Sequence, residues 1–153
     1  MNGLKLQQGH IINERGIKMD NKIKHLEMIQ GVINRMARNS FMLKGWAVTL
    51  AAGIFALASK DTDKMYFLIT YVPIIVFWIL DSYYLLEERL YRDLYNDVRK
   101  KNDSEIDFSL NASGYAKKDY RRTLLGCIIS KTELGFYLPL ALICSCVIII
   151  THI

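Results

Sequence analysis

The last twenty residues of the chain, Leu134 to Ile153, contain no charged side chain apart from His152, which carries a charge only when protonated. An α-helix needs about 20 predominantly apolar residues to cross the ~30 Å hydrocarbon core of a bilayer. A stretch of this length and composition predicts a transmembrane helix at the C-terminal end. It also indicates that the chain is a membrane protein.

Two earlier segments are also apolar. Residues 45–59 carry no charge, and this segment extends to Phe41 if the long side chain of Lys44 reaches the membrane surface. Residues 65–80 form the other segment, which continues through residues 82–86 beyond Asp81. The sequence therefore predicts an all-α membrane protein with long cytoplasmic helical extensions and three transmembrane helices, over residues 41–59, 65–86 and 133–153.

The length of the chain limits what else it contains. With 153 residues and three spans, little sequence remains for a soluble core, so a catalytic domain of ordinary size is not expected. The first eighteen residues show no apolar run of the signal-peptide type, and all three spans are expected to be retained. Cys127, Cys144 and Cys146 form no pairing pattern and are interpreted as small packing residues.

The basic residues predict the orientation of the spans. Seven Lys and Arg residues precede the first span and ten lie between Asp81 and Lys131, whereas the connector at residues 60–64 holds only two. Basic loops stay on the cytoplasmic side. The N-terminus and residues 87–132 are therefore expected in the cytoplasm, and the C-terminus outside.

The region before the first span divides into two parts. Residues 1–19 show no sustained period and are expected to form a loosely ordered tail. Residues 20–40 are expected to form a helix whose apolar side chains recur at intervals of three and four residues, at Leu26, Ile29, Ile33 and Met36. This seam packs either on the chain's own cytoplasmic helices or on another subunit.

The second span is expected to continue into the cytoplasm as one long helix. Leu86, Leu90, Leu94 and Val98 recur every four residues after Asp81. A polar loop is expected over residues 101–113, followed by a further helical piece over about residues 114–129. The Ser-x-x-Glu spacing of residues 130–133 then predicts a capping box at the start of the last span.

Lys44, Asp81 and His152 are expected near a membrane surface, so the three predicted spans carry no ionisable residue near their middle. This disfavours an ion-coupled transporter. The first span instead has small residues at four-residue spacing, which allow helices in lipid to approach closely either within a subunit or between subunits. We expect self-association through the seam and this small-residue face, at Ile29, Ile33, Met36, Gly45, Thr49 and Gly53.

No catalytic or metal-binding motif is found, and neither an enzyme nor a cofactor is expected. The remaining candidates for a functional site are a set of basic residues expected in the cytoplasm. Guanidinium groups suit phosphates, so these residues are candidates for binding a nucleotide or a single-stranded oligonucleotide. The alternative is that they reflect only the positive-inside bias and contact with lipid headgroups. The set comprises Arg35, Arg38, Arg89, Arg92, Arg99, Lys100, Lys101, Lys117, Lys118, Arg121 and Arg122.

Two runs of sequence resemble a known family. They are HLEMIQGVINRMARNSFMLKGWAVTLAAGIFALA at residues 25–58 and FWILDSYYLLEERLYRDLYNDVRK at residues 77–100, with the local patterns NRMA-x-NSF, LKGW and D-x-YYL-x-EER. Together they are similar to the transmembrane effectors of Hailong-type systems, which are small bacterial membrane proteins of phage-defence loci. The resemblance implies an oligomeric effector in the bacterial inner membrane that depolarises or permeabilises it, under control of a nucleotide product of a partner nucleotidyltransferase.

Two functions from different classes follow. The leading one is a pore-forming or membrane-disrupting effector gated by a cytoplasmic anionic ligand. The alternative is a non-conducting membrane anchor that recruits a soluble partner through residues 81–132.

Overall fold

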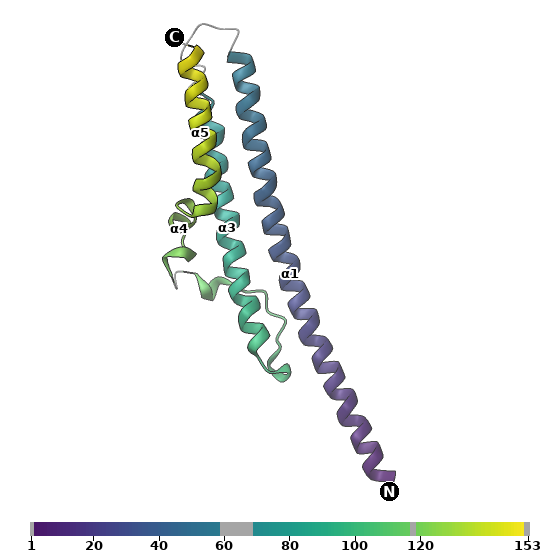
Figure 1. The fold of residues 1–153 in the computed structure, drawn as a ribbon. Helices are drawn as coiled ribbons and strands as arrows, with labels where there is room; N and C mark the ends of the chain where they lie inside the picture. Colours follow the sequence, from purple (N-terminus) through teal and green to yellow (C-terminus); the bar gives the residue numbers. More distant parts are fainter. Residues whose placement is uncertain (1, 59–68, 117–118, 152–153) are drawn as a thin grey trace.

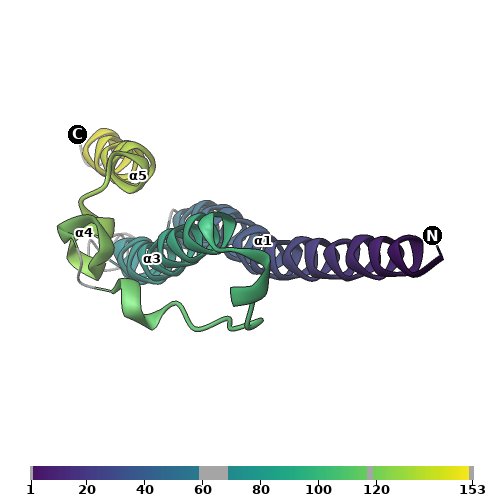
Figure 2. The ribbon, with the colours of Figure 1, turned by 90° about the horizontal axis from the view of Figure 1, so that it is seen from below.

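A computed structural model describes residues 2–58, 69–116 and 119–151 of the chain, and within these ranges it contains helices and loops but no strand. The three long helices are α1 (Asn2–Ala58), α3 (Tyr71–Lys100) and α5 (Lys131–Thr151). They lie beside one another over part of their length, and α1 continues well beyond the other two toward its N-terminal end (Figure 1). In the view from below, the three helices do not share one plane (Figure 2). The expected all-α fold class is confirmed for the described residues.

Helix α1 runs without a break from Asn2 to Ala58. It joins the helix expected over residues 20–40 to the apolar segment that follows. The loosely ordered tail expected over residues 1–19 was wrong from Asn2 onward, because those residues are helical. Extending an existing helix needs no new nucleus, so good helix formers such as Leu, Lys and Gln can continue it past glycines that each cost about 1 kcal/mol.

Helix α3 spans Tyr71–Lys100, which confirms that the apolar segment after Thr70 continues as one helix beyond Asp81. It ends where Lys101 adopts an extended backbone, with φ −64° and ψ 151°. Arg99 and Lys100 lie in the last turn, where positive charge is favoured by the helix dipole. Residues 65–68 of the expected second span lie outside the described residues.

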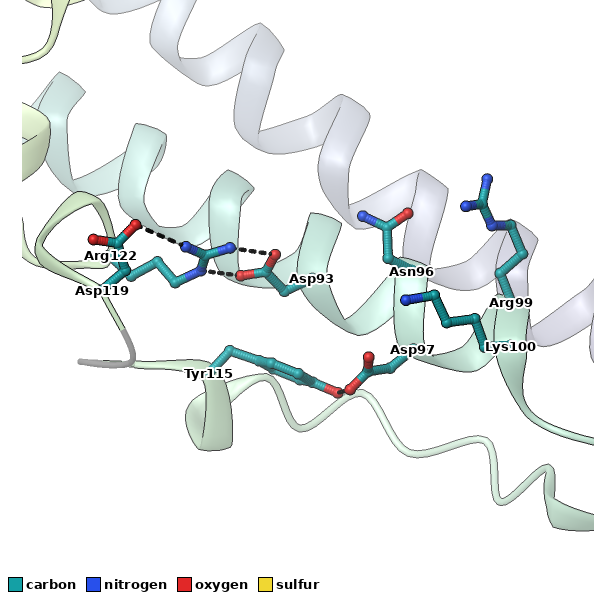
Figure 3. A pocket seen from close by; sticks show the side chains of 8 residues that line it. All are labelled: Asp93, Asn96, Asp97, Arg99, Lys100, Tyr115, Asp119 and Arg122. Carbon is teal, nitrogen blue, oxygen red and sulfur yellow. Dashed lines mark hydrogen bonds and ion pairs between the residues drawn. The ribbon is translucent and has the colours of Figure 1, made fainter.

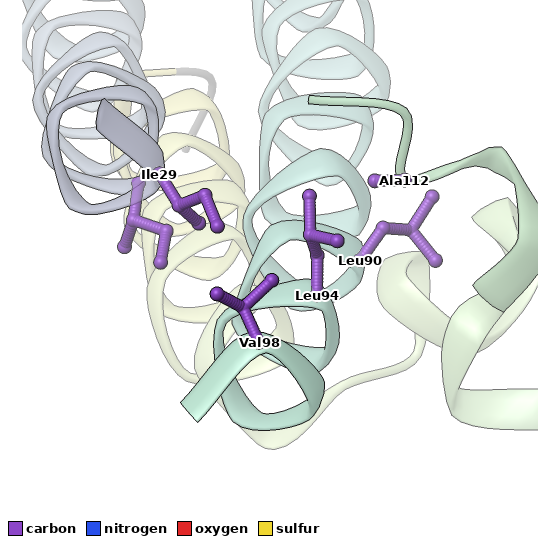
Figure 4. Close-up of a cluster of buried hydrophobic side chains, with 6 residues drawn as sticks. Ile29, Leu90, Leu94, Val98 and Ala112 are labelled. Atoms are coloured by element: carbon purple, nitrogen blue, oxygen red, sulfur yellow. The ribbon is translucent and has the colours of Figure 1, made fainter. Parts of the chain in front are cut away.

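The apolar seam of α1 packs against the stripe of α3. Ile29 and Ile33 are buried against Leu90, Leu94 and Val98. Figure 4 labels Ile29 of α1 and Leu90, Leu94 and Val98 of α3 in this cluster, with Leu90 turned toward Ala112. The sequence left open whether the seam packs on the chain's own helices or on another subunit. In the structure it packs on α3 of the same chain.

The chain after α3 is irregular, as expected for residues 101–113. The described residues of this segment contain three short 3-10 turns, η1 (Asp103–Glu105), η2 (Ser113–Tyr115) and η3 (Tyr120–Arg122), followed by the short helix α4 (Leu124–Ile128). The single helix expected over residues 114–129 was therefore wrong. Thr123 adopts an extended backbone and its Oγ1 accepts a hydrogen bond from the Gly126 nitrogen at 3.1 Å, which starts α4 as a separate helix.

Helix α5 spans Lys131–Thr151 and packs on the apolar halves of α1 and α3. Ala47, Ala51, Ile74, Tyr137 and Cys144 form the buried centre of this contact. Two helical segments in the described part of the chain are long and apolar enough to cross a membrane, over Met19–Leu57 and Lys131–Ile149. They contain residues 41–57 of the first expected span and residues 133–149 of the third, and the first segment begins 22 residues before the expected span.

Candidate functional site

Four polar side chains from three helices meet where α5 begins. Lys44 of α1 pairs with Asp81 of α3, and its Nζ lies 3.4 Å from Oε1 of Glu133 on α5. The hydroxyl of Tyr137 donates to Oδ2 of Asp81 at 3.1 Å. Asp81, Glu133 and Tyr137 are fully buried, and the Lys44 side chain is 17% exposed. We refer to these four residues as the polar junction.

Aromatic side chains enclose the polar junction. The Lys44 ammonium lies 5.7 Å from the ring centre of Phe136 and 5.9 Å from that of Tyr137, within the range of cation–π attraction. Trp78 stacks on Tyr137 with ring centres 5.7 Å apart, and its Nε1 donates to the Ile128 carbonyl at 3.1 Å. The junction is thereby tied to α4 as well as to the three long helices.

The junction carries one ammonium against two carboxylates. Oδ1 of Asp81 and Oε2 of Glu133 are buried and have no hydrogen-bond partner among the described residues. Buried charges are strongly penalised unless they are paired and hydrogen-bonded, so this arrangement is costly for a structural contact alone. Ionisable residues in such a setting are candidates for function.

The sequence analysis did not find this site. It assigned Lys44 and Asp81 to the membrane surface, and Glu133 to a capping box with Ser130. Half of that box is present, because the Glu133 nitrogen donates to Oγ of Ser130 at 3.4 Å. The other half is absent, since the Glu133 carboxylate contacts Lys44 and the Ser130 nitrogen donates to the Cys127 carbonyl at 2.9 Å.

The basic residues predicted to bind an anion do not form one site. Lys117 and Lys118 lie outside the described residues. Arg35 and Arg38 are exposed on α1 and line none of the clefts formed by α3 and the segment that follows it. Lys101 lies 3.8 Å from Asp107. The other predicted basic residues border clefts of differing charge.

One cleft, of about 570 Å³, mixes acids and bases (Figure 3). Arg122 forms two hydrogen bonds to Asp93, one of them 2.7 Å long, and lies 3.4 Å from Asp119. The hydrogen bond to Asp93 raises the pKa of the Arg122 guanidinium. The three acidic and three basic side chains that line the cleft balance one another, so it offers no net positive charge to an anionic ligand. The lining residues are Asp93, Asn96, Asp97, Arg99, Lys100, Tyr115, Asp119 and Arg122.

Two side chains that line the same cleft, Tyr115 and Asp97, are hydrogen-bonded to each other. The Tyr115 hydroxyl donates to Oδ2 of Asp97 at 2.5 Å. Burial and then this hydrogen bond raise the pKa of Tyr115 to about 12. The contact holds the loop after α3 against the last turns of α3.

A second cleft, of about 460 Å³, is lined by three basic side chains and no acidic one. They are Arg89, Arg121 and Lys131, of which Lys131 was not among the predicted residues. Nη1 of Arg89 donates to the Arg121 carbonyl at 2.7 Å and lies 3.4 Å from Sγ of Cys127. We refer to this as the basic cleft. Arg92 lies outside it, on a neighbouring surface where it pairs with Glu88 at 2.7 Å.

Some of the residues expected to mediate self-association are buried within the chain, and others are exposed. Ile29 and Ile33 are covered by α3, and Met36 is half-buried. Gly45, Thr49 and Gly53 are exposed on α1. A Cβ added to either glycine would meet no described atom within 4 Å. The small-residue face is therefore open in the single chain.

Comparisons of this chain with protein-family models, with curated proteins and with solved structures find no match.

Proposed function

We propose that this chain is an effector of the bacterial inner membrane whose copies associate in the bilayer and then depolarise or permeabilise it. In this proposal the N-terminus is cytoplasmic and the C-terminus is periplasmic or extracellular. A cytoplasmic anionic ligand, such as a nucleotide or oligonucleotide made by a partner nucleotidyltransferase, controls the assembly. The resemblance to effectors of phage-defence loci suggests a role in antiviral defence.

The observation that carries this proposal is the open small-residue face of α1. Gly45, Thr49 and Gly53 lie on the same side of the helix, exposed and without a neighbour at either glycine. In lipid, helices associate where small residues allow close backbone contact, since lipid tails supply no hydrophobic driving force between helices. An exposed face of this kind on an apolar helix favours contact with another copy of the chain.

The surface of the other apolar segments supports a third span. Val72, Ile75, Val76, Ile79 and Leu80 of α3 are exposed large hydrophobic residues, beside those of α1 and α5. Exposing so much apolar surface to water is unfavourable, whereas exposing it to lipid is not. We infer that α3 crosses the bilayer between α1 and α5.

The continuity of α3 supports ligand control. Arg89 of the basic cleft lies on the same uninterrupted helix as Asp81 of the polar junction, eight residues away. A ligand that binds one arrangement of the helices more tightly than another shifts the population toward that arrangement. The basic cleft is the part of the predicted ligand surface that lacks opposing carboxylates.

Membrane-potential dye imaging tests the proposal in cells that express the chain with and without a partner nucleotidyltransferase. Gly53→Leu fills the open face and is expected to abolish or strongly reduce depolarisation. Gly31→Leu is the matched control, because it makes the same change on the same helix, also in open space but outside the apolar half. Unchanged potential with the wild-type chain under both conditions would contradict the proposal.

The second candidate is a non-conducting anchor that recruits a soluble partner through residues 81–132. The charge pairing in the cytoplasmic segment favours it, because Arg92 and Arg122 are already neutralised by acids of the chain. Such a mixed-charge surface suits a protein better than a polyanion. An anchor retains its partner on affinity purification and leaves the membrane potential unchanged.

A further inference from the structure

The charged groups of the polar junction do not cancel one another. If both carboxyl groups are ionised, Lys44 supplies one positive charge against two negative ones. Both carboxyl side chains are completely buried, and each has one oxygen without a partner among the described residues. One additional positive charge would make the junction neutral.

A proton fits this position better than a metal ion. The described residues contain no group of three His, Cys, Asp or Glu side chains that could hold a metal. The Lys44 ammonium already contacts both carboxyl groups, so it would repel a metal cation placed there. A proton instead converts one carboxylate into a neutral acid with an O–H donor. It removes the surplus charge without needing further ligands.

The hydrogen bonds indicate which carboxyl group takes the proton. Oδ2 of Asp81 accepts from both Lys44 and Tyr137, and donors of this kind stabilise the ionised form. Among the described residues, the side-chain donor to the Glu133 carboxyl group is Lys44, in a longer contact of 3.4 Å. We propose that the polar junction is a proton-binding site in which Glu133 holds one exchangeable proton, and that this proton keeps α1, α3 and α5 packed together.

Other ionisable groups around the junction do not supply this proton. Lys44 comes from α1 and Tyr137 from α5, and both bond to Asp81 of α3. Cys127 of α4 interacts electrostatically with Glu133, and its Sγ contacts Nη1 of Arg89 on α3 at 3.4 Å. Burial raises the pKa of the Cys127 thiol, so this group stays protonated at neutral pH.

The proposal gives the membrane assembly a response to cytoplasmic pH. The packed junction binds one proton that separated, hydrated carboxylates release at neutral pH, so rising pH favours separation of the helices. Linkage to one proton changes the equilibrium by about tenfold per pH unit within the titration range. This response goes beyond control by an anionic ligand and does not require that such a ligand exists.

Infrared spectroscopy of the full chain, reconstituted in phosphatidylcholine vesicles, tests the proposal directly. A protonated carboxyl group in a dry site gives a C=O stretching band that ionised carboxylates lack. We expect such a band at neutral pH in the wild type, its loss at alkaline pH, and its absence from Glu133→Gln. Glu27→Gln is the control, because Glu27 is an exposed carboxylate on α1, and it should leave the band unchanged.

The outcomes separate this proposal from the proposed function, because the measurement does not depend on conductance. Absence of the band from the wild type between neutral and acidic pH would overturn the proton site. Persistence of the band in Glu133→Gln would overturn the assignment to Glu133. If circular dichroism shows that Glu133→Gln does not fold, Glu133→Asp keeps the acid on a shorter side chain. The band should then shift in frequency, and an unshifted band counts against the proposal.

Discussion

Replacing Lys44 by Met should destabilise the helix bundle strongly. The substitution keeps a long apolar side chain but removes the ammonium that contacts both Asp81 and Glu133, which are fully buried. Tyr137 would remain as the only donor to Asp81 among the described residues. Breaking a buried ion pair by removing one partner costs about 3–5 kcal/mol, since an uncompensated charge is left behind. That corresponds to a factor of roughly 10² to 4 × 10³ in the ratio of folded to unfolded protein.

The free energy of unfolding can be measured by circular dichroism in a mild detergent, with SDS as the denaturant. Arg38→Met is the matched control, because Arg38 is exposed on the same helix and should contribute less than about 1 kcal/mol. Adding Asp81→Asn and Glu133→Gln to Lys44→Met removes the buried charges together and should recover most of the loss. A loss below about 1 kcal/mol for Lys44→Met, or no recovery in the triple variant, would refute the reasoning.

Three further predictions concern the cytoplasmic segment and the seam. Gly126→Ala should lower the midpoint of thermal unfolding, because its Cβ would lie 2.0 Å from a backbone oxygen of η3, whereas Gly114→Ala, with open space around it, should not. Ile33→Ala removes a side chain that is 3% exposed, and it should reduce the free energy of unfolding by about 2–5 kcal/mol in the same detergent assay. Tyr115 should titrate near pH 12 by ultraviolet absorbance, and closer to the usual tyrosine pKa of 10.0 in Asp97→Asn. Because its pKa is raised on folding, its contribution to stability is present below pH 10 and is lost as the pH rises toward 12.

The long helices could be predicted because their signals are local. The four-residue recurrence of Leu90, Leu94 and Val98 predicted the extension of α3, and the structure buries all three side chains. The seam at Ile29 and Ile33 was also recognised from its spacing. Spacing alone did not say what would cover the seam, since another subunit would bury the same stripe.

The polar junction could not be predicted from spacing because its members are far apart in the chain. Lys44 is 37 residues from Asp81 and 89 residues from Glu133. The one available signal was the position of these ionisable residues next to apolar segments. The sequence analysis explained Lys44 and Asp81 by the membrane surface and Glu133 by a capping box. For the cytoplasmic arginines the error was different. Residue type predicted an anion site, although Glu88 lies four residues before Arg92 on the predicted helix and could have been recognised as its partner. The partner of Arg122, Asp93, is 29 residues away and became visible only in the folded chain.

Because α1 is long and Lys44 lies near its C-terminal end, a tilt of α1 about the polar junction would move its two ends by different distances. At about 1.5 Å per residue, the arm of α1 from Lys44 to Asn2 is ~63 Å long, whereas the arm from Lys44 to Ala58 is ~21 Å long. A tilt of about 10° around the junction would move the N-terminal end by ~11 Å and the opposite end by ~4 Å. A small change in the contacts of Lys44 is thus magnified about threefold at the N-terminal end. A spectroscopic label near Met19 is therefore better placed to detect such a tilt than one in the apolar half of the helix.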